Sequence, residues 1–211
     1  TTWEAGTRGE WRHASHHLGW DATYYRANLR HEFQSVCAVP GCTTPSTQNV
    51  PKTLHQGLEL GLTHRDGGAF DSRMALLYSD FRFVDHPVYG NNAMPGFPPL
   101  IVRGEVLHRF GAEVNGKRAF YAGPKLEWVP RPAPMDNTNT VDRDGYTLLG
   151  FKAGQAIDKT WSWFADARNL THKKYAADSN ISANLASNGA GALYYPGDGR
   201  AIYFGIEAKI D

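Results

Sequence analysis

The residues of this sequence that could bind a metal are histidines and methionines in polar, irregular segments. His13, His16 and His17 cluster within RHASHHLG, and the chain has 9 histidines in all. None stands in a zinc-type spacing with cysteine or carboxylate, so ordinary solvated histidines are the favoured interpretation. Met94 and Met135 could offer thioether ligands to Cu(I), although a loop methionine more commonly makes an apolar contact. We therefore expect no metal site.

A second set of side chains could supply acid–base chemistry. Asp80, Asp85 and His86 lie close together in sequence, and two acids with a histidine can activate water when they converge. The adjoining segment HPVYGNN has a single glycine, Gly90, and predicts a loop rather than a phosphate-binding turn. No constellation in the chain argues for catalysis, and we do not expect an enzyme.

The two cysteines, Cys37 and Cys42, occur in the segment CAVPGC. The intervening Pro-Gly step allows a turn that brings the sulfurs together, and a disulfide would imply an oxidising compartment. Two free thiols or part of a metal site are the other interpretations. We favour the disulfide if the chain is exported.

The elements that position these residues show apolar and polar side chains alternating with a period of two, and helical periodicity is almost absent. In residues 53–64, Leu58, Leu60 and Leu62 share one face while His55 and Glu59 share the other. Similar runs predict an all-β, antiparallel fold of about ten strands. The runs cover residues 3–11, 20–29, 53–64, 74–84, 102–114, 120–130, 146–157, 161–170 and 201–210.

The connections alternate in length. Short polar turns occur at RHASHHLG, HRDGGAF, NGKRA and IDKT, and segments rich in Pro, Gly and Asn cover residues 34–50, 85–100, 130–144 and 176–197. Short turns on one side and long loops on the other are typical of transmembrane β-barrels of the outer membrane. A soluble antiparallel sandwich can also alternate short and long connections, but it rarely does so this regularly.

Charges on the polar face decide which side of the strands meets water. They recur deep within the runs, at Glu59, Arg103, Glu105, Arg109, Glu113, Lys125 and Lys152. In a wide membrane barrel such charges face a wet lumen and the apolar side chains face lipid. We therefore assign Leu58, Leu60, Phe151, Ile202 and Phe204 to lipid acyl chains. Aromatic residues near strand ends, including Trp128 and Trp163, suit interfacial girdles.

Composition narrows the classes of function. The net charge is +1, the mean hydropathy is −0.48, and no basic tract predicts nucleic-acid binding. No apolar run reaches the roughly 18 residues of a membrane-spanning helix, but spanning strands are short and half polar. The chain starts with Thr1 as though already inside a strand, which suggests a piece of a longer protein.

Five motifs together resemble the C-terminal part of the barrel of a TonB-dependent outer-membrane receptor of the siderophore type. They are NVPKTLHQGLELGL (49–62), LHRFGAEV (107–114), YAGPKLEWVP (121–130), WFADARNLTHKKY (163–175) and YYPGDGRAIYFGIEAKI (194–210). In the fourth, Asn169 and Tyr175 are expected to mark the outer exit of a strand; a glycosylation acceptor at Asn169 is the competing interpretation.

The resemblance implies that residues 1–211 are the C-terminal portion of a 22-stranded, multi-pass barrel in the outer membrane of a Gram-negative bacterium. The N-terminal strands, the plug and its TonB box would lie outside this chain. The expected partners are the rest of the barrel, the TonB complex through the plug, outer-membrane lipid or lipopolysaccharide, and a small-molecule metal chelate. The last two residues, Ile210 and Asp211, depart from the aromatic end usual in the family.

The resemblance also implies import of a scarce nutrient complex, most often a ferric siderophore, with no bound cofactor. Haem, cobalamin and copper stay open as cargo. Aromatic and polar loop residues would contact the ligand: His86, Tyr89, Asn91, Asn92, Asn137, Asn139, Arg143, Tyr194 and Tyr195. The alternatives are a ten-stranded outer-membrane protease that uses Asp85 and His86, and a soluble β interaction module.

Overall fold

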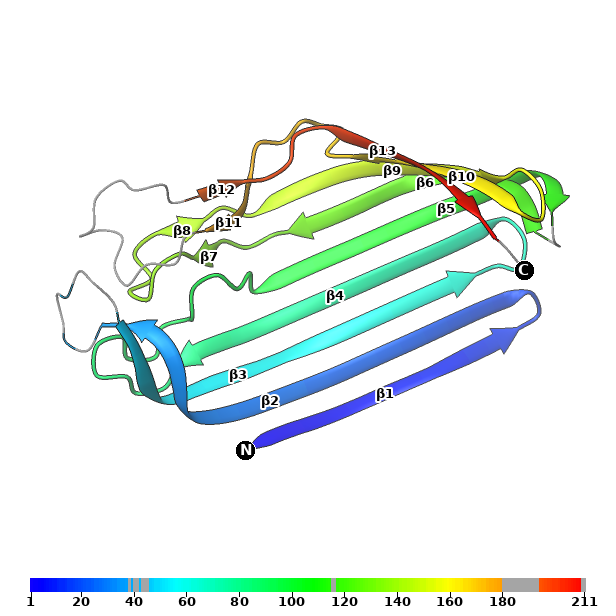
Figure 1. Cartoon of the computed structure of the whole chain (residues 1–211). Coiled ribbons are helices and arrows are strands. Elements are labelled where there is room, and N and C mark those ends of the chain that lie inside the picture. The colour runs from blue at the N-terminus through cyan, green and yellow to red at the C-terminus, as the bar shows by residue number, and fades with distance from the viewer. Residues whose placement is uncertain (38, 40–41, 43–45, 115–116, 180–193, 210–211) are drawn as a thin grey trace.

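The computed structural model describes residues 1–37, 39, 42, 46–114, 117–179 and 194–209. A nine-stranded antiparallel sheet forms a curved wall (Figure 1). Its strands in spatial order are β1 (Thr2–His13), β2 (His16–Val36), β3 (Ser46–Arg65), β4 (Phe70–Phe83), β5 (Leu100–Val114), β6 (Lys117–Val129), β9 (Tyr146–Ala156), β10 (Trp161–Arg168) and β13 (Ala201–Ala208). No helix that could cross a bilayer occurs in the described residues.

The all-β, antiparallel fold expected from the sequence is confirmed, with nine strands in the wall where about ten were expected. The remaining strands form two short ribbons, β7 (Ala133–Pro134) with β8 (Asp142–Arg143) and β11 (Ala176–Ser179) with β12 (Tyr194–Pro196). β1 and β13 stand at the two ends of the strand order, so each has one free edge in the described sheet.

Short turns join the strands at one end of the wall, the turn end, and long segments leave it at the other, the loop end (Figure 1). In HRDGGAF, Asp66 Oδ1 accepts hydrogen bonds from the amides of residues 68–70 at 2.7–2.9 Å. Asp158 holds the IDKT turn in the same way, as aspartate does in Asx-turns. In NGKRA, residues 115–116 lie outside the described part of the chain.

One face of the wall carries a continuous band without charged side chains, called here the outward band. Register partners share a face of a sheet, so Leu60 lies there with Ala22 and Leu76. Its other members include Leu58, Leu62, Met74, Val102, Leu126, Leu149, Phe151, Ala165, Ile202 and Phe204. The side chains assigned to lipid are not packed in a dry interior, since Phe151 is 44% and Ile202 77% exposed.

Aromatic side chains border the outward band at both ends. At the turn end, ring contacts with centroids 4.5–6.1 Å apart cross the sheet through Phe70, His108, Phe110, Phe120, Trp163 and Phe204. At the loop end, Tyr24 and Tyr78 flank Leu58 in register. Phe70 and Tyr78 are eight residues apart on β4, which is about 27 Å along the strand.

Four glycines of the wall lie directly opposite an aromatic residue in register, and the ring covers each glycine. The pairs are Gly9 with Trp20, Gly57 with Tyr25, Gly154 with Tyr121 and Gly205 with Phe164. A Cβ added to Gly57 would lie 2.5 Å from Tyr25 Oη, closer than van der Waals contact allows. These ring-covered glycines occur between β1 and β2, β2 and β3, β6 and β9, and β10 and β13.

A hydrophobic core lies at the loop end. The loop cluster is formed by the β2–β3 tip, residues 84–99 and residues 130–145, and its buried side chains include Val36, Cys37, Val50, Phe83, Tyr89 and Met94. Phe83 is 1% exposed and Met135 is fully buried. Residues 84–99 and 130–145 are therefore a packed structure rather than solvated loops.

Candidate functional site

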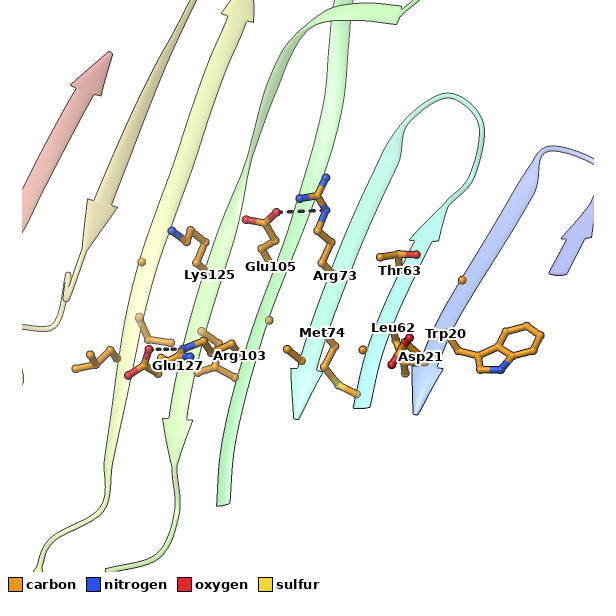
Figure 2. Close-up of a pocket in the computed structure, with 18 of the residues that line it drawn as sticks. Trp20, Asp21, Leu62, Thr63, Arg73, Met74, Arg103, Glu105, Lys125 and Glu127 are labelled. Atoms are coloured by element: carbon orange, nitrogen blue, oxygen red, sulfur yellow. Dashed lines mark hydrogen bonds and ion pairs between the residues drawn. The ribbon is translucent and has the colours of Figure 1, made fainter. Parts of the chain in front are cut away.

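The polar face of the wall lines a hollow of about 910 Å³ on its concave side (Figure 2). Oppositely charged side chains from different strands meet on this polar face: Arg109 and Asp71 at 2.6 Å, Arg73 and Glu105 at 3.9 Å, Arg103 and Glu127 at 2.7 Å, and Lys125 and Asp166 at 2.7 Å. This arrangement places the charges expected on the polar face on the side opposite the outward band.

These ion pairs show what the hollow can contain. Ionised side chains are costly to remove from water unless they are fully paired, and Arg103 and Arg73 keep most of their side-chain surface exposed. Tyr146 donates a further hydrogen bond to Glu127 at 2.9 Å. The concave side therefore suits water or a polar partner, not an apolar core.

A polar group that the sequence did not single out lies on the concave side near the loop end. Thr53 donates a hydrogen bond to Glu32 at 2.5 Å, and His55 Nε2 lies 3.3 Å from the same carboxylate. His55 Nε2 is buried and has no hydrogen bond to any of the described residues. Phe81 stacks on His55, and Phe97 contacts Phe81 edge-on.

The backbone at His31 explains why Glu32 faces the concave side. His31 has a positive φ of 58°, a left-handed conformation that is uncommon outside glycine. Arg30 and His31 are both exposed, and Glu32 is then turned toward Thr53. This interruption of the period-two pattern has no sequence signal, so the alternation alone places Glu32 on the wrong face.

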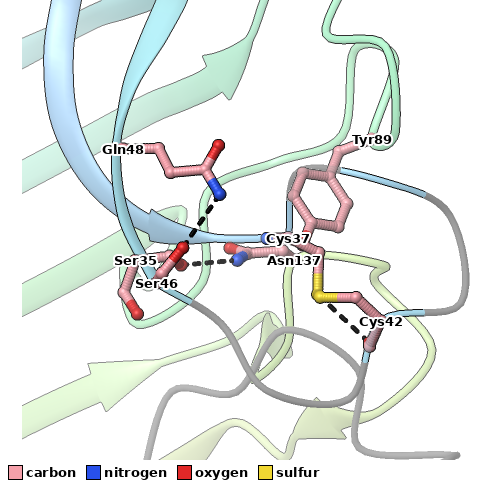
Figure 3. Close-up of a disulfide and its surroundings, with 7 residues drawn as sticks. All are labelled: Ser35, Cys37, Cys42, Ser46, Gln48, Tyr89 and Asn137. Carbon is pink, nitrogen blue, oxygen red and sulfur yellow. Dashed lines mark hydrogen bonds between the residues drawn. A yellow bond between two sulfur atoms is a disulfide. The ribbon is translucent and has the colours of Figure 1, made fainter.

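The expected ligand residues His86 and Tyr89 lie within the loop cluster. His86 Nδ1 accepts hydrogen bonds from the amides of Val88 and Tyr89 at 3.1 and 3.2 Å, and its ring stacks on Tyr89. Burial lowers the pKa of His86 below its ordinary value. Tyr89 Oη accepts a hydrogen bond from the amide of Cys37 at 2.8 Å (Figure 3). Both side chains are buried, and they hold the loops together.

Three expected asparagines link loop segments that are distant in sequence. Asn137 Nδ2 donates to Ser35 O at 3.1 Å (Figure 3), and Asn92 Nδ2 donates to Asn137 O at 2.9 Å. Asn139 accepts from the amide of Ala93 and donates to its carbonyl, both at 2.9 Å. The asparagines therefore connect the β2–β3 tip with residues 84–99 and 130–145.

The other expected ligand residues divide by exposure. Arg143 is buried and donates to Ala177 O at 2.5 Å. Asn91 is exposed and accepts a hydrogen bond from the amide of Asp85. Tyr194 and Tyr195 on β12 are 47% and 58% exposed. Ligand contact stays a prediction for all nine residues, and the geometry leaves Asn91, Tyr194 and Tyr195 accessible from solvent.

The sulfurs of Cys37 and Cys42 are joined as a disulfide in the structure, with Cα atoms 5.8 Å apart (Figure 3). Cys37 belongs to the buried core of the loop cluster, and Cys42 packs against that core. The bond therefore ties Cys42 to the buried core that contains Phe83 and Tyr89. Met94 and Met135 are 4% and 0% exposed, and Met94 packs in the same apolar core.

The histidines of the turn end and the acids near His86 do not form a reactive centre. His16 Nδ1 lies 3.2 Å from His64 Nε2 on the exposed surface, and the described residues contain no group of three or more His, Cys, Asp or Glu that could hold a metal ion. Asp80 is paired with Arg82 and Gln56 on the outward face, whereas His86 is buried in the loop cluster. These side chains do not converge as a protease site requires.

The strand end at Asn-Leu-Thr has a local explanation. Asn169 has a positive φ of 48° directly after β10, and asparagine tolerates this conformation better than most residues. Its side chain accepts from the amide of Lys173 and donates to the carbonyls of Lys173 and Asp198 at 2.8–2.9 Å. Asn169 is buried, and it joins the end of β10 to the segment before β13.

Comparisons with known proteins agree with this architecture. Residues 1–170 match the family model described as TonB dependent receptor-like, beta-barrel, and no curated protein sequence matches the chain. Similar solved structures include the ferric citrate transporter FecA (17% identity, TM-score 0.73, 99% of this chain and 31% of that one). The siderophore receptor PiuA from Acinetobacter baumannii is also similar, with 16% identity and a TM-score of 0.71 over 99% of this chain and 28% of that one. The copper transporter OprC is similar with 18% identity and a TM-score of 0.70 over 98% of this chain and 31% of that one.

The chain spans about a third or less of the length of these solved structures. At such low identity the likeness to them concerns the fold alone, whereas the family model covers most of the chain. Its members are transport receptors with β-barrels in the outer membrane, not enzymes. The chain therefore belongs to the TonB-dependent receptor family, in which it represents part of the β-barrel.

Proposed function

We propose that this chain forms the C-terminal part of the wall of an outer-membrane receptor that imports a ferric siderophore, energised through TonB. The observation that carries the proposal is the contrast between the two faces of the sheet. The outward band has no charge between its aromatic borders, whereas the concave side carries cross-strand ion pairs around a hollow of about 910 Å³.

The outward band fits contact with lipid. An arginine or lysine on the lipid face of a barrel costs about 2–4 kcal/mol at the bilayer midplane. With strands tilted by about 40°, the distance between Phe70 and Tyr78 corresponds to a band about 20 Å tall. In this proposal the turn end faces the periplasm and the loop end the exterior of a Gram-negative bacterium, and the chain crosses the outer membrane many times.

In this proposal the concave side forms part of the lumen, and the loop end is where the cargo enters. The free edges of β1 and β13 are expected to pair with the remaining strands of the same barrel, since unpaired backbone groups are costly in lipid. A plug engaged by the TonB complex would then occupy the polar lumen. A chelate entering from outside would meet the loop end, where Asn91, Tyr194 and Tyr195 are exposed.

A ferric chelate is favoured as cargo by the names of similar structures. These include the siderophore receptor PiuA and the ferric citrate transporter FecA. OprC is named a copper transporter, but Met94 and Met135 of this chain are both buried, so no exposed thioether in the described residues favours Cu(I).

Uptake by cells that produce the full-length receptor tests the proposal. Radioactive iron would be supplied as catecholate, hydroxamate and citrate complexes, with haem, cobalamin and copper as parallel cargoes. We expect one class of ferric chelate to accumulate, and accumulation to stop in a strain without TonB or after the proton-motive force is collapsed. Uptake that persists without TonB, or no uptake of any ferric chelate, would contradict the proposal.

A further inference from the structure

A cluster of cations lies on the outward face of β2, β3 and β4, on the loop-end side of Tyr24 and Tyr78. This cationic patch consists of Arg26, Arg30, Lys52 and Arg82. Register places Arg26 opposite Gln56, Arg30 opposite Lys52 and Arg82 opposite Leu54. Arg26 is two residues beyond Tyr24 on β2, about 7 Å along the strand. The patch therefore begins where the uncharged band ends.

The patch carries more positive charge than its own residues neutralise. Asp80 is its carboxylate, and this carboxylate binds the Arg82 guanidinium, with Nε 3.0 Å from Oδ1. Gln56 links Asp80 to Arg26, since its Nε2 donates to Asp80 at 2.7 Å and its Oε1 accepts from Arg26 Nη1 at 3.3 Å. Arg30 and Lys52 are exposed and have no ion pair with any described residue.

Arg30 and Lys52 lie opposite each other, and these two cations are the residues that need an anionic partner. Like charges directly opposite each other on neighbouring strands destabilise a sheet. On the concave side, by contrast, Arg103 is opposite Glu127 in register and forms an ion pair with it. A pair of cations at matched positions, beside a third cation at Arg26, is stabilised when an external anion lies between them.

We propose that the cationic patch binds phosphate groups of the phosphorylated glycolipid in the outer leaflet, that is, lipopolysaccharide. The inference rests on the proposed function, because it needs the loop end to face outward. Tyr24 and Tyr78 then lie at the interface, and the patch lies at the level of the lipid headgroups. Arginine and lysine form short, charge-assisted hydrogen bonds with phosphate oxygens. The imported chelate is not the ligand of this patch, since the patch faces away from the hollow.

Binding of diphosphoryl lipid A to the full-length receptor in detergent tests the inference. The Arg30→Gln/Lys52→Gln variant would be compared with wild type and with Lys173→Gln/Lys174→Gln, which removes two exposed cations beyond β10. We expect the patch variant to bind about tenfold more weakly and the control variant to bind within about twofold of wild type. Lipid A without phosphates should bind all three proteins equally weakly.

Three outcomes would overturn the assignment: equal affinity of the three proteins for diphosphoryl lipid A, equal loss in the control variant, or displacement of the lipid by inorganic phosphate at the same concentration. The last outcome would identify a site for free phosphate. Uptake of the ferric chelate, measured on the same variants, separates this inference from the proposed function. If the receptor imports no chelate, but the patch variant still binds lipid A more weakly than wild type, the lipid site stands and only the proposed transport function fails.

Discussion

The loop cluster and the wall place their apolar side chains in opposite environments. At the loop end, Phe83, Val50 and Met135 are at most 1% exposed, whereas Ile202 and Phe204 on β13 are 77% and 66% exposed. The loop cluster is thus a small core made by the chain itself. The described part of the wall has no such core, and in the proposed receptor it depends on lipid on one face and on water or protein on the other. The same residue types therefore stabilise the two regions by different means.

Removing a core side chain from the loop cluster gives the largest expected effect. Phe83→Ala should destabilise the loop cluster by about 3–5 kcal/mol, because a buried ring is replaced by a cavity. Hydrogen exchange at the amides of Cys37 and Gly90 measures this opening. Phe33→Ala, at an exposed position near the loop end of β2, is the matched control. If both variants exchange alike, the loop cluster is not an independent core.

Placing a charge on the wall tests the other half of the comparison. Leu149 and Leu148 are neighbours on β9, but Leu149 is opposite Leu126 in the outward band and Leu148 is opposite Glu127 on the concave side. Leu149→Arg should cost about 2–4 kcal/mol in lipid, and Leu148→Arg less than about 1 kcal/mol. Denaturant unfolding of the reconstituted receptor measures both. A larger cost for Leu148→Arg would reverse the assignment of the two faces.

Removing the disulfide tests whether the loop cluster is a self-contained unit. The chain-entropy model gives about 2 kcal/mol for a closed loop of this size. Cys37→Ala/Cys42→Ala should therefore raise hydrogen exchange in residues 84–99 while the outward band stays unchanged. Mass spectrometry with and without reductant verifies that the wild-type bond is present. Faster exchange spread evenly over the wall would contradict the separation of the two regions.

The smallest effect is expected at the turn end, where hydrogen bonds from the amides of Phe70 and Gly68 lower the pKa of Asp66 to about 2. The ionised carboxylate is the acceptor, so the turn is fully stabilised above about pH 4 and loses this contribution as the pH falls toward 2. Hydrogen exchange of residues 68–70 should accelerate over that range. Asp66→Asn keeps Oδ1 as an acceptor and should remove the pH dependence; an unchanged pH profile would exclude Asp66 as the cause.

The wall could be predicted from the sequence, since its pattern is local. Alternation located the strands, placed Leu60 and Phe151 on the outward face, and the Asn-Leu-Thr step marked the end of β10. The loop cluster could not be predicted in this way, because its contacts join distant segments. Asn137 binds Ser35 across 102 residues, and no local pattern distinguishes a loop asparagine that joins two segments from one that meets a ligand.

The departures of the structure from the expectations have specific causes. His86 and Tyr89 look like exposed polar loop residues, but the packing of Phe83 and Val36 turns them inward. Glu32 reaches the concave side because His31 adopts a left-handed conformation, and the sequence does not predict this conformation for a histidine. The ring-covered glycines could have been found from cross-strand register, which the sequence alone does not supply.

The ring-covered glycines make the observed register between neighbouring strands more favourable than a shifted one. Tyr25 can lie flat on the neighbouring strand only where Gly57 is its partner, and Tyr121 only where it meets Gly154. A strand shifted by two residues keeps its faces correct, so lipid contact would not reject it. Such a shift would, however, place His55 or Glu59 beneath Tyr25, or the stem of Lys152 beneath Tyr121, where the ring needs empty space. In four pairs of adjacent strands, the ring-covered glycines therefore disfavour a hairpin that is misaligned by two residues.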